Sequence, residues 1–172
     1  ADSARQRFAF EEILMFQLRS LLDRRQLQTL KAPTINFDKD SVVNFVKKLP
    51  FELTNDQRIA TYEILKDLEK NYPMNRLLNG DVGSGKTVVA LIAGYQTAMA
   101  GLQIVFMAPT EILAKQHFDS LHSLSAGTNL KIGLLTGSEA RQWPTDEITN
   151  EKISKKLMQQ KIASGEIQMI IG

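Results

Sequence analysis

The chain has 172 residues, 43% of them hydrophobic, and a formal net charge of +2 at pH 7. This length suffices for one ordinary globular domain with an appendage, and so small a charge neither indicates nor excludes a nucleic-acid partner. The absence of cysteine excludes disulfides, thiolate metal sites and a cysteine nucleophile. No apolar run approaches the ~20 residues of a membrane span, and the polar N-terminus is not typical of a signal peptide. We expect no membrane partner and a cytoplasmic location, with which this composition is compatible.

The first third of the chain is predicted to be helical. Over residues 3 to 30, apolar side chains recur at three- and four-residue steps, and three further ones (Phe8, Met15 and Phe16) widen this surface beyond that of a solvated helix. We therefore expect this helix to pack on another segment. Residues 31 to 40 are predicted to be irregular, and Ser41 to Lys48 to form a short helix capped by Asp40 or Ser41. A domain boundary is placed here, with a helical connector over residues 1–48 and a nucleotide domain over 49–172.

Thr54 and Gln57 begin the next predicted helix with the spacing of a capping box. The Thr54 side chain would accept from the amide of Gln57, and the Gln57 side chain would reach back. Gln57 also precedes a glycine-rich loop by about 23 residues, and its amide offers the donor and the acceptor that adenine N6 and N7 require. Spacing alone favours the capping box, and the two roles can coexist.

The strongest motif in the chain runs from Gly80 to Thr87 and fits G-x-x-x-x-G-K-[ST] at every defined position. Its glycines allow positive φ and let the backbone approach phosphate, while the amides after Gly83 would point inward at the positive end of a helix dipole. Lys86 can reach the β- and γ-phosphates of ATP, and the Thr87 hydroxyl can bind Mg²⁺. We predict that the site comprises Gly80, Asp81, Val82, Gly83, Ser84, Gly85, Lys86 and Thr87, with Lys86 and Thr87 in the catalytic roles.

Strands and helices are predicted to alternate around this loop. A buried strand at Met74 to Leu78 and a helix at Val88 to Ala100 provide the setting that the motif requires. The elements expected downstream are a strand buried on both faces (103–108), a helix capped by Thr110 with Ile112, Leu113 and Phe118 facing inward (to 124), a strand (131–135), a polar excursion (139–150), a helix with a solvated lysine face (151–163) and a strand (167–171).

Two turns of small residues follow strands in this pattern, Pro109-Thr110 and Thr136-Gly137. A helix that opens at the carboxyl edge of a sheet offers amides to an anion such as a nucleic-acid phosphate. Without the glycine-rich motif of residues 80–87, which we call the phosphate loop, plain strand-to-helix turns would be the preferred interpretation. His117 and His122 have no carboxylate or cysteine partners at metal-site spacing and are expected to be ordinary residues.

The order of elements resembles the first motor domain of superfamily 2 helicases, and the amino-acid sequences of the motifs resemble those of the RecG family of bacterial branched-DNA helicases. The segments that carry the resemblance are Leu49–Thr54 with Gln57, Pro73–Leu78, Gly80–Ala90, Met107–His117, Leu134–Ser138 and Ser164–Gly172. The N-terminal helix is similar to the connector that this family places before its motor.

The resemblance implies an α/β fold with a RecA-like, doubly wound parallel sheet. It also implies an ATP site in which Phe51 flanks and Gln57 contacts adenine, and phosphate contacts from Pro109, Thr110, Thr136 and Gly137 to one DNA strand. It implies an ATP-driven DNA helicase that remodels replication forks and Holliday junctions in recombination and repair. The acidic D-E-x-H box of the family would lie after Gly172, so residues 1–172 alone are expected to bind nucleotide weakly and to hydrolyse none. Residues 139–163 are longer than the usual connection, and no role carries over to them.

Two alternatives stay open. One is another duplex translocase, of the transcription-repair coupling type, although Ala108 to Leu113 fits it less well. The other is a P-loop kinase or nucleotide-sensing module unrelated to DNA, which would have no use for anion-binding turns after the second and third strands.

Overall fold

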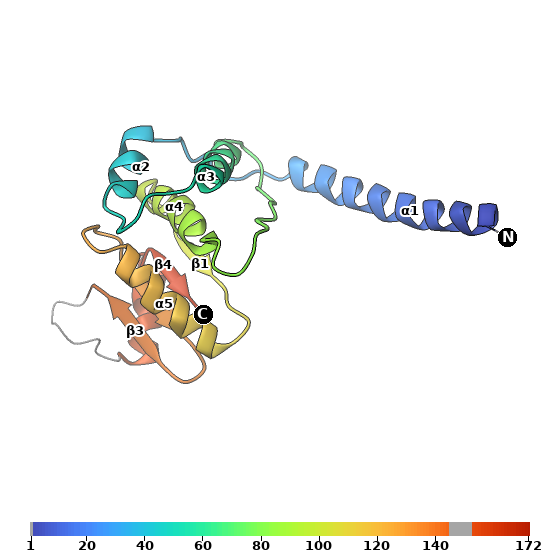
Figure 1. The fold of residues 1–172 in the computed structure, drawn as a ribbon. Coiled ribbons are helices and arrows are strands. Elements are labelled where there is room, and N and C mark those ends of the chain that lie inside the picture. The colour runs from blue at the N-terminus through green and yellow to red at the C-terminus, as the bar shows by residue number, and fades with distance from the viewer. Residues whose placement is uncertain (1, 145–152) are drawn as a thin grey trace.

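The computed structural model describes residues 2–144 and 153–172 and shows a long helix extending from an α/β body (Figure 1). The elements in chain order are α1 (Asp2–Thr29), α2 (Lys39–Val46), α3 (Asn55–Leu68), α4 (Lys86–Met99), β1 (Ile104–Phe106), α5 (Glu111–Leu124), β2 (Ile132–Leu135), β3 (Ala140–Trp143), α6 (Lys155–Ala163) and β4 (Met169–Ile171).

The strands form one sheet in the order β1-β4-β2-β3, with β4 parallel to both of its neighbours and β3 antiparallel at the edge. Ile132 and Leu134 of β2 face the core beneath α4 and α5, whereas Gly133 between them faces Met158 of α6. Because successive side chains of a strand point to opposite faces, helices cover both sides of the sheet. The expected doubly wound α/β fold is confirmed, with one antiparallel edge strand added.

A further layer of helices packs on the outer side of α4. Phe45 of α2 is buried and stacks on Tyr95 of α4 with 4.4 Å between the ring centroids. The Gln96 side chain of α4 donates to the carbonyl of Asn36 at 2.9 Å, and Leu65 of α3 is buried in the same core. Residues that precede Leu49 therefore share the hydrophobic core of the body.

Helix α1 stands apart from this core. Its apolar side chains are largely exposed, with Phe8 at 70%, Ile13 at 63%, Met15 at 67% and Phe16 at 80%. Ile13 and Met15 point to nearly opposite sides, since two residues of an α-helix correspond to about 200° of rotation. Exposed apolar side chains thus lie on more than one side of the helix, and the packing partner expected for it is not found among the described residues.

The cap of α2 differs from the expectation. The helix begins at Lys39, and Asp38, rather than Asp40 or Ser41, accepts the amides of Asp40 and Ser41 at 3.1 Å each. The hydroxyl of Ser41 also donates to Asp38 at 2.5 Å, and these hydrogen bonds lower the pKa of the Asp38 carboxyl. The cap lies earlier because Asp38 has the extended backbone conformation that an N-cap residue needs.

The strand expected at Met74 to Leu78 does not form, and Leu77 is 90% exposed. A strand requires a hydrogen-bonded neighbour, and no strand of the described sheet pairs with this segment. The strand β1, expected to be buried on both faces, is half-buried on one face through Ile104 and Phe106, whereas Val105 on the other face is 64% exposed. Apolar runs locate strands, but neighbouring elements decide which strands form and how deeply they are buried.

Three further predictions differ from the structure. Ala140 to Trp143, expected within a polar excursion, pairs with β2 as β3, and the remainder of that excursion (145–150) lies outside the described residues. The last helix begins at Lys155, capped by Ser154. In α5, Phe118 is buried as expected, but Ile112 is 70% and Leu113 37% exposed because the inward face is formed by Ala114, Phe118 and Leu121.

Candidate nucleotide site and nucleic-acid groove

The glycine-rich segment forms a loop directly before α4. Gly83 and Gly85 have φ values of +83° and +82°, the left-handed conformation that non-glycine residues rarely adopt. Gly80 does not share this expected conformation, and a Cβ there would lie 2.7 Å from Ser84 Oγ, which would have to move aside. Gly85 is the N-cap of α4 and makes no side-chain cap. The first amides of α4 are therefore directed toward the loop without a side chain bound to them, as an anion site requires.

Lys86 bridges the loop with its side chain. Its Nζ donates to the carbonyls of Gly80 at 2.7 Å and Asp81 at 2.8 Å. An ammonium group has three donors, so it can give up these carbonyls for phosphate oxygens without leaving the loop. Thr87 follows in the first turn of α4, half-buried, and Val82 lies fully exposed at the tip of the loop.

Gln57 joins the start of α3 to this loop. The capping box is confirmed, since the Gln57 side chain accepts from the Thr54 amide at 2.9 Å and the Thr54 hydroxyl accepts from the Gln57 amide at 3.3 Å. The other end of the Gln57 side chain donates to the carbonyl of Ser84 at 2.9 Å. The same side chain thus serves the helix cap and lies beside the phosphate loop. Phe51 is 45% exposed in the bend that precedes the capping box.

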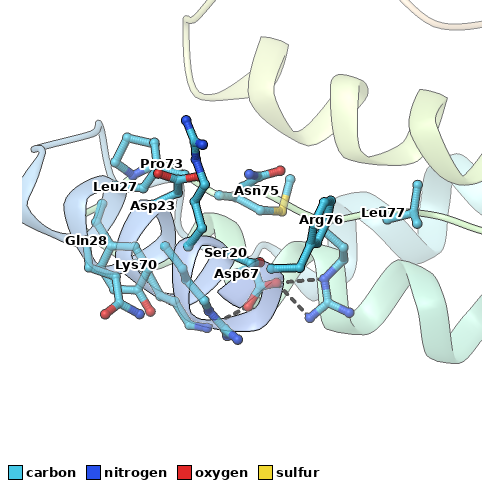
Figure 2. A pocket seen from close by; sticks show the side chains of 15 residues that line it. Ser20, Asp23, Leu27, Gln28, Asp67, Lys70, Pro73, Asn75, Arg76 and Leu77 are labelled. Atoms are coloured by element: carbon cyan, nitrogen blue, oxygen red, sulfur yellow. Dashed lines mark hydrogen bonds and ion pairs between the residues drawn. The ribbon is translucent and has the colours of Figure 1, made fainter. Parts of the chain in front are cut away.

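The extended segment that leads into the loop is fixed to α3 by charge. Arg76 forms ion pairs with Asp67 at 2.7 Å and with Glu63 at 2.6 Å, and Lys70 forms one with Asp67 at 2.6 Å. Asp67, Lys70 and Arg76 also line a groove of about 940 Å³ between α1 and residues 72–77 (Figure 2). Burial raises the pKa of Asp67, but hydrogen bonds from Lys70 and Arg76 outweigh it and the pKa falls below the ordinary value. This anchor could not be predicted from local sequence patterns, because Arg76 is nine and thirteen residues from Asp67 and Glu63.

A second groove lies at the carboxyl edge of the sheet. Because β1 and β2 both run parallel to β4, their carboxyl ends meet there, and the turns that follow them face each other. The groove has a volume of about 410 Å³ and is lined by Ala108, Pro109, Thr110, Glu111, Leu135, Thr136, Gly137, Lys155, Gln159 and Gly172. The structure thus brings together all four residues that were expected to contact DNA.

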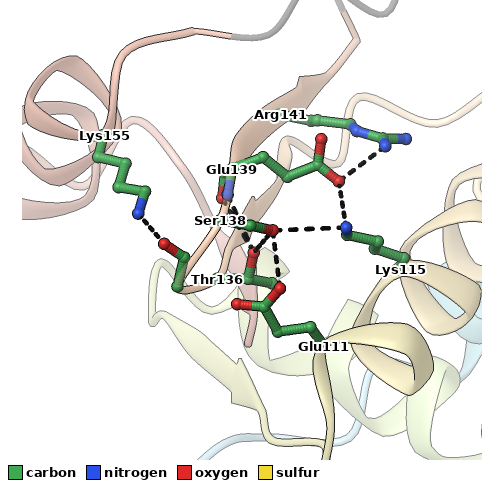
Figure 3. Close-up of polar contacts among 8 residues, drawn as sticks. Glu111, Lys115, Thr136, Ser138, Glu139, Arg141 and Lys155 are labelled. Carbon is green, nitrogen blue, oxygen red and sulfur yellow. Dashed lines mark hydrogen bonds and ion pairs between the residues drawn. The ribbon is translucent and has the colours of Figure 1, made fainter.

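A network of charged side chains stabilises the two turns (Figure 3). Ser138 donates to Glu111 at 2.7 Å, and this hydrogen bond lowers the pKa of the Glu111 carboxyl. Lys115 and Arg141 contact the buried carboxylate of Glu139 at 3.0 and 2.8 Å. The backbone of Glu139 closes the turn, since its carbonyl accepts from the Thr136 amide at 2.9 Å.

The sequence patterns did not indicate a functional role for these network residues. Glu111 and Lys115 are four apart on one helix face, a spacing that could have indicated their proximity. The contacts of both with residues 138 and 139 could not be predicted, because they depend on how α5 packs beside β2.

Other candidate sites are limited. Among the described residues there is no cluster of three or more histidine, cysteine or acidic side chains that could hold a metal by itself. The two histidines lie among aromatic rings, with His117 4.8 Å from Phe106 and His122 3.9 Å from Trp143 between ring centroids. Over the residues that the structure describes, none of the helices is long and apolar enough to cross a membrane.

Comparison with known proteins gives consistent matches. The family model for the DEAD/DEAH box helicase matches residues 54–170. ATP-dependent DNA helicase RecG of Aquifex aeolicus is 37% identical over 171 residues, which is 99% of this chain and 20% of the relative. RecG of Bacillus subtilis is 42% identical over 173 residues, 98% of this chain and 23% of the relative. The chain thus spans about a fifth of the length of these relatives.

A solved structure, described as RecG bound to a three-way DNA junction, superposes with a TM-score of 0.82. It is 36% identical and covers 98% of this chain and 22% of the RecG chain. The resemblance that the sequence motifs indicated is confirmed. The family model covers about two thirds of the chain and includes the phosphate loop and both turns of the groove. The chain therefore belongs to the DEAD/DEAH box helicase family.

Proposed function

We propose that the full-length protein is an ATP-dependent DNA helicase that remodels branched DNA, such as replication forks and Holliday junctions, in recombination and repair. The observation that carries the proposal is the meeting of two turns of small residues, Pro109-Thr110 and Thr136-Gly137, in one groove of a body that also bears a phosphate loop. Similarity to RecG over nearly the whole chain supports it, since the similar solved structure is bound to a three-way DNA junction. A cytoplasmic location, where such DNA is processed, is part of the proposal.

In this proposal, the loop of Gly80 to Thr87 binds the triphosphate of ATP. The amides at the start of α4 and the Nζ of Lys86 would hold phosphate oxygens, and the Thr87 hydroxyl would bind Mg²⁺. Bound Mg²⁺ neutralises charge on the phosphates during phosphoryl transfer. Gln57 and Phe51 would contact the adenine. The metal-holding acid and the group that orients the attacking water are assigned to no residue of this chain.

The groove would bind the backbone of one DNA strand. Backbone amides and the hydroxyls of Thr110 and Thr136 suit phosphate contacts, which position a nucleic acid without selecting its sequence. We assign residues 49–172 to the first part of a RecA-like motor and residues 1–48 to a helical connector, of which Ile35 to Val46 packs on the motor.

The test is ATP hydrolysis by the full-length protein with and without a DNA fork. Fork DNA should stimulate hydrolysis. Lys86→Ala should abolish the stimulated rate, because it removes the ammonium group that would contact the phosphates. Lys156→Ala, on the exposed surface of α6, is the matched control and should retain activity.

Hydrolysis that ignores DNA would contradict the proposal and favour a P-loop kinase or nucleotide sensor. Stimulation by linear duplex equal to that by a fork would favour a translocase of the transcription-repair coupling type.

A further inference from the structure

Helix α6 provides a third wall of the groove. Lys155 and Gln159, one helical turn apart, line it together with the turns after β1 and β2. We propose that Lys155 is a further phosphate-binding residue, which contacts the DNA strand held by these two turns. The inference rests on the proposed function and assigns a role to the segment between β3 and β4, to which the family resemblance assigned none.

The charge balance of the groove indicates this role. Among the described residues that line it, Lys155 is the only cation and Glu111 the only anion. The Glu111 carboxylate lies against Gly137, where a Cβ would be 2.6 Å from its oxygen, and remains ionised at neutral pH because Ser138 donates to it. Without Lys155 the lining would have a net charge of −1 and would repel a phosphate backbone.

The nearest other cations are already engaged. Lys115 and Arg141 both contact Glu139, at 3.0 and 2.8 Å, and neither lines the groove. One buried carboxylate therefore holds both cations away from the groove lining and compensates one of their two positive charges. Lys155 is exposed, and Figure 3 shows its side chain reaching across to the Thr136–Ser138 turn from the opposite side.

Lys155 already occupies the position that a phosphate contact requires. Its Nζ donates to the carbonyl of Gly137, within the turn that is expected to contact DNA. An ammonium group has three donors, so this hydrogen bond leaves two for a phosphate oxygen beside the same turn. Gln159 lies on the same face of α6, and its amide can donate to the neighbouring sugar-phosphate unit.

The experiment measures fork-DNA affinity of the full-length protein as a function of salt. Lys155→Gln removes the charge but keeps an amide that can donate to Gly137, while Lys156→Gln removes the same charge from an exposed neighbour that does not line the groove. We expect Lys155→Gln to weaken binding about five- to eightfold at about 0.1 M salt. The salt slope, which is the slope of the logarithm of the binding constant against the logarithm of the salt concentration, should fall by the amount expected for about one lost phosphate contact. Lys156→Gln should leave both values close to those of the unmodified protein.

Lys155→Arg distinguishes phosphate binding from a structural role, because it keeps the charge in a different shape. It should restore the salt slope if Lys155 contacts phosphate. The inference would be overturned if Lys155→Gln and Lys156→Gln had equal salt slopes, or if Lys155→Arg reduced the salt slope as much as Lys155→Gln does. Either result would leave the proposed function intact. Failure of the unmodified protein to bind fork DNA would overturn the proposed function itself.

Discussion

At the scale of single residues, the phosphate loop depends on close contacts that only glycine permits. Gly85 has a left-handed backbone, and a Cβ there would lie 2.3 Å from the side-chain nitrogen of Gln57. The same nitrogen donates to the carbonyl of Ser84. Conformation and space at Gly85 therefore both favour glycine, and a substitution would disturb the link between α3 and the loop.

Gly85→Ala is predicted to weaken nucleotide binding and to lower the free energy of unfolding by more than the roughly 1 kcal/mol of a left-handed alanine. Gly101→Ala is the matched control, because Gly101 has φ +77° with nothing within 4 Å of its Cβ position. It should show the backbone cost alone. Urea unfolding and nucleotide titration of both variants measure the difference, and equal effects would show that the contact with Gln57 is unimportant.

Asp67 provides a prediction with a pH dependence. Its pKa is lowered in the folded state, so its ion pairs stabilise the fold above the ordinary value of 3.8 and this stability is lost as the pH falls through the folded pKa. Asp67→Asn should reduce the free energy of unfolding at pH 7 by on the order of 1 kcal/mol, and the deficit should narrow below about pH 4. Urea unfolding across this range is the measurement. Asp119→Asn, on the exposed side of α5, should change little at either pH, and a deficit for Asp67→Asn that widens in acid would contradict the prediction.

At the scale of elements, threonine and serine caps mark the starts of three helices, α3, α5 and α6. Thr54, Thr110 and Ser154 each accept an amide three residues ahead, at the starts of α3, α5 and α6. Such caps are local in sequence, which explains why those of α3 and α5 were predicted correctly. Of these three caps, that of α3 is connected to the phosphate loop, because the Gln57 side chain accepts from the Thr54 amide and donates to the Ser84 carbonyl.

Thr54→Ala is predicted to cost about 1 kcal/mol of stability, because the backbone amide of Gln57 loses the Thr54 hydroxyl that accepts from it. The loosened first turn of α3 should also hold the Gln57 side chain less firmly beside the loop and so weaken nucleotide binding. Ser154→Ala removes a cap of the same kind, with an amide–hydroxyl distance of 3.2 Å, at a helix far from the phosphate loop along the chain. It should cost similar stability and leave nucleotide affinity unchanged. Thr54→Ser should restore both properties, and nucleotide affinity that is unaffected by Thr54→Ala would show that the cap and the loop act independently.

At the scale of the whole molecule, α1 is the element that the described structure leaves without a partner. Large apolar side chains exposed together on one element mark a surface that contacts other protein. The chain spans about a fifth of the length of its relatives. We infer that, in a full-length protein of similar length, other protein covers α1 on more than one side.

Phe16→Ser is predicted to have different effects in two contexts. In the 172-residue chain, Phe16 is 80% exposed and the free energy of unfolding should change by less than about 0.5 kcal/mol. In the full-length protein the same change should cost about 3 kcal/mol, because a buried aromatic side chain is lost. Denaturant unfolding of both proteins tests this, and a small effect in both would show that α1 remains exposed.

Local patterns determined a large part of this protein. The phosphate loop, the caps of α3 and α5, the alternation of strands and helices and the small-residue turns all depend on residues that lie within a few positions of one another. Backbone conformation and hydrogen bonding over such distances follow from residue type. The sequence alone therefore predicted the α/β class, which the structure confirms, and the residues that we propose for the ATP site.

Only the tertiary structure decided which distant segments meet. It placed Thr110 beside Thr136, brought Lys155 to the same groove, joined Arg76 to Asp67 and left residues 74 to 78 without a strand partner. Strand pairing and ion pairs between elements depend on the order of the sheet and on how the helices pack against it, which no local pattern specifies. The chemistry of the sites was therefore encoded locally, whereas their assembly depended on the packing of the sheet and its helices.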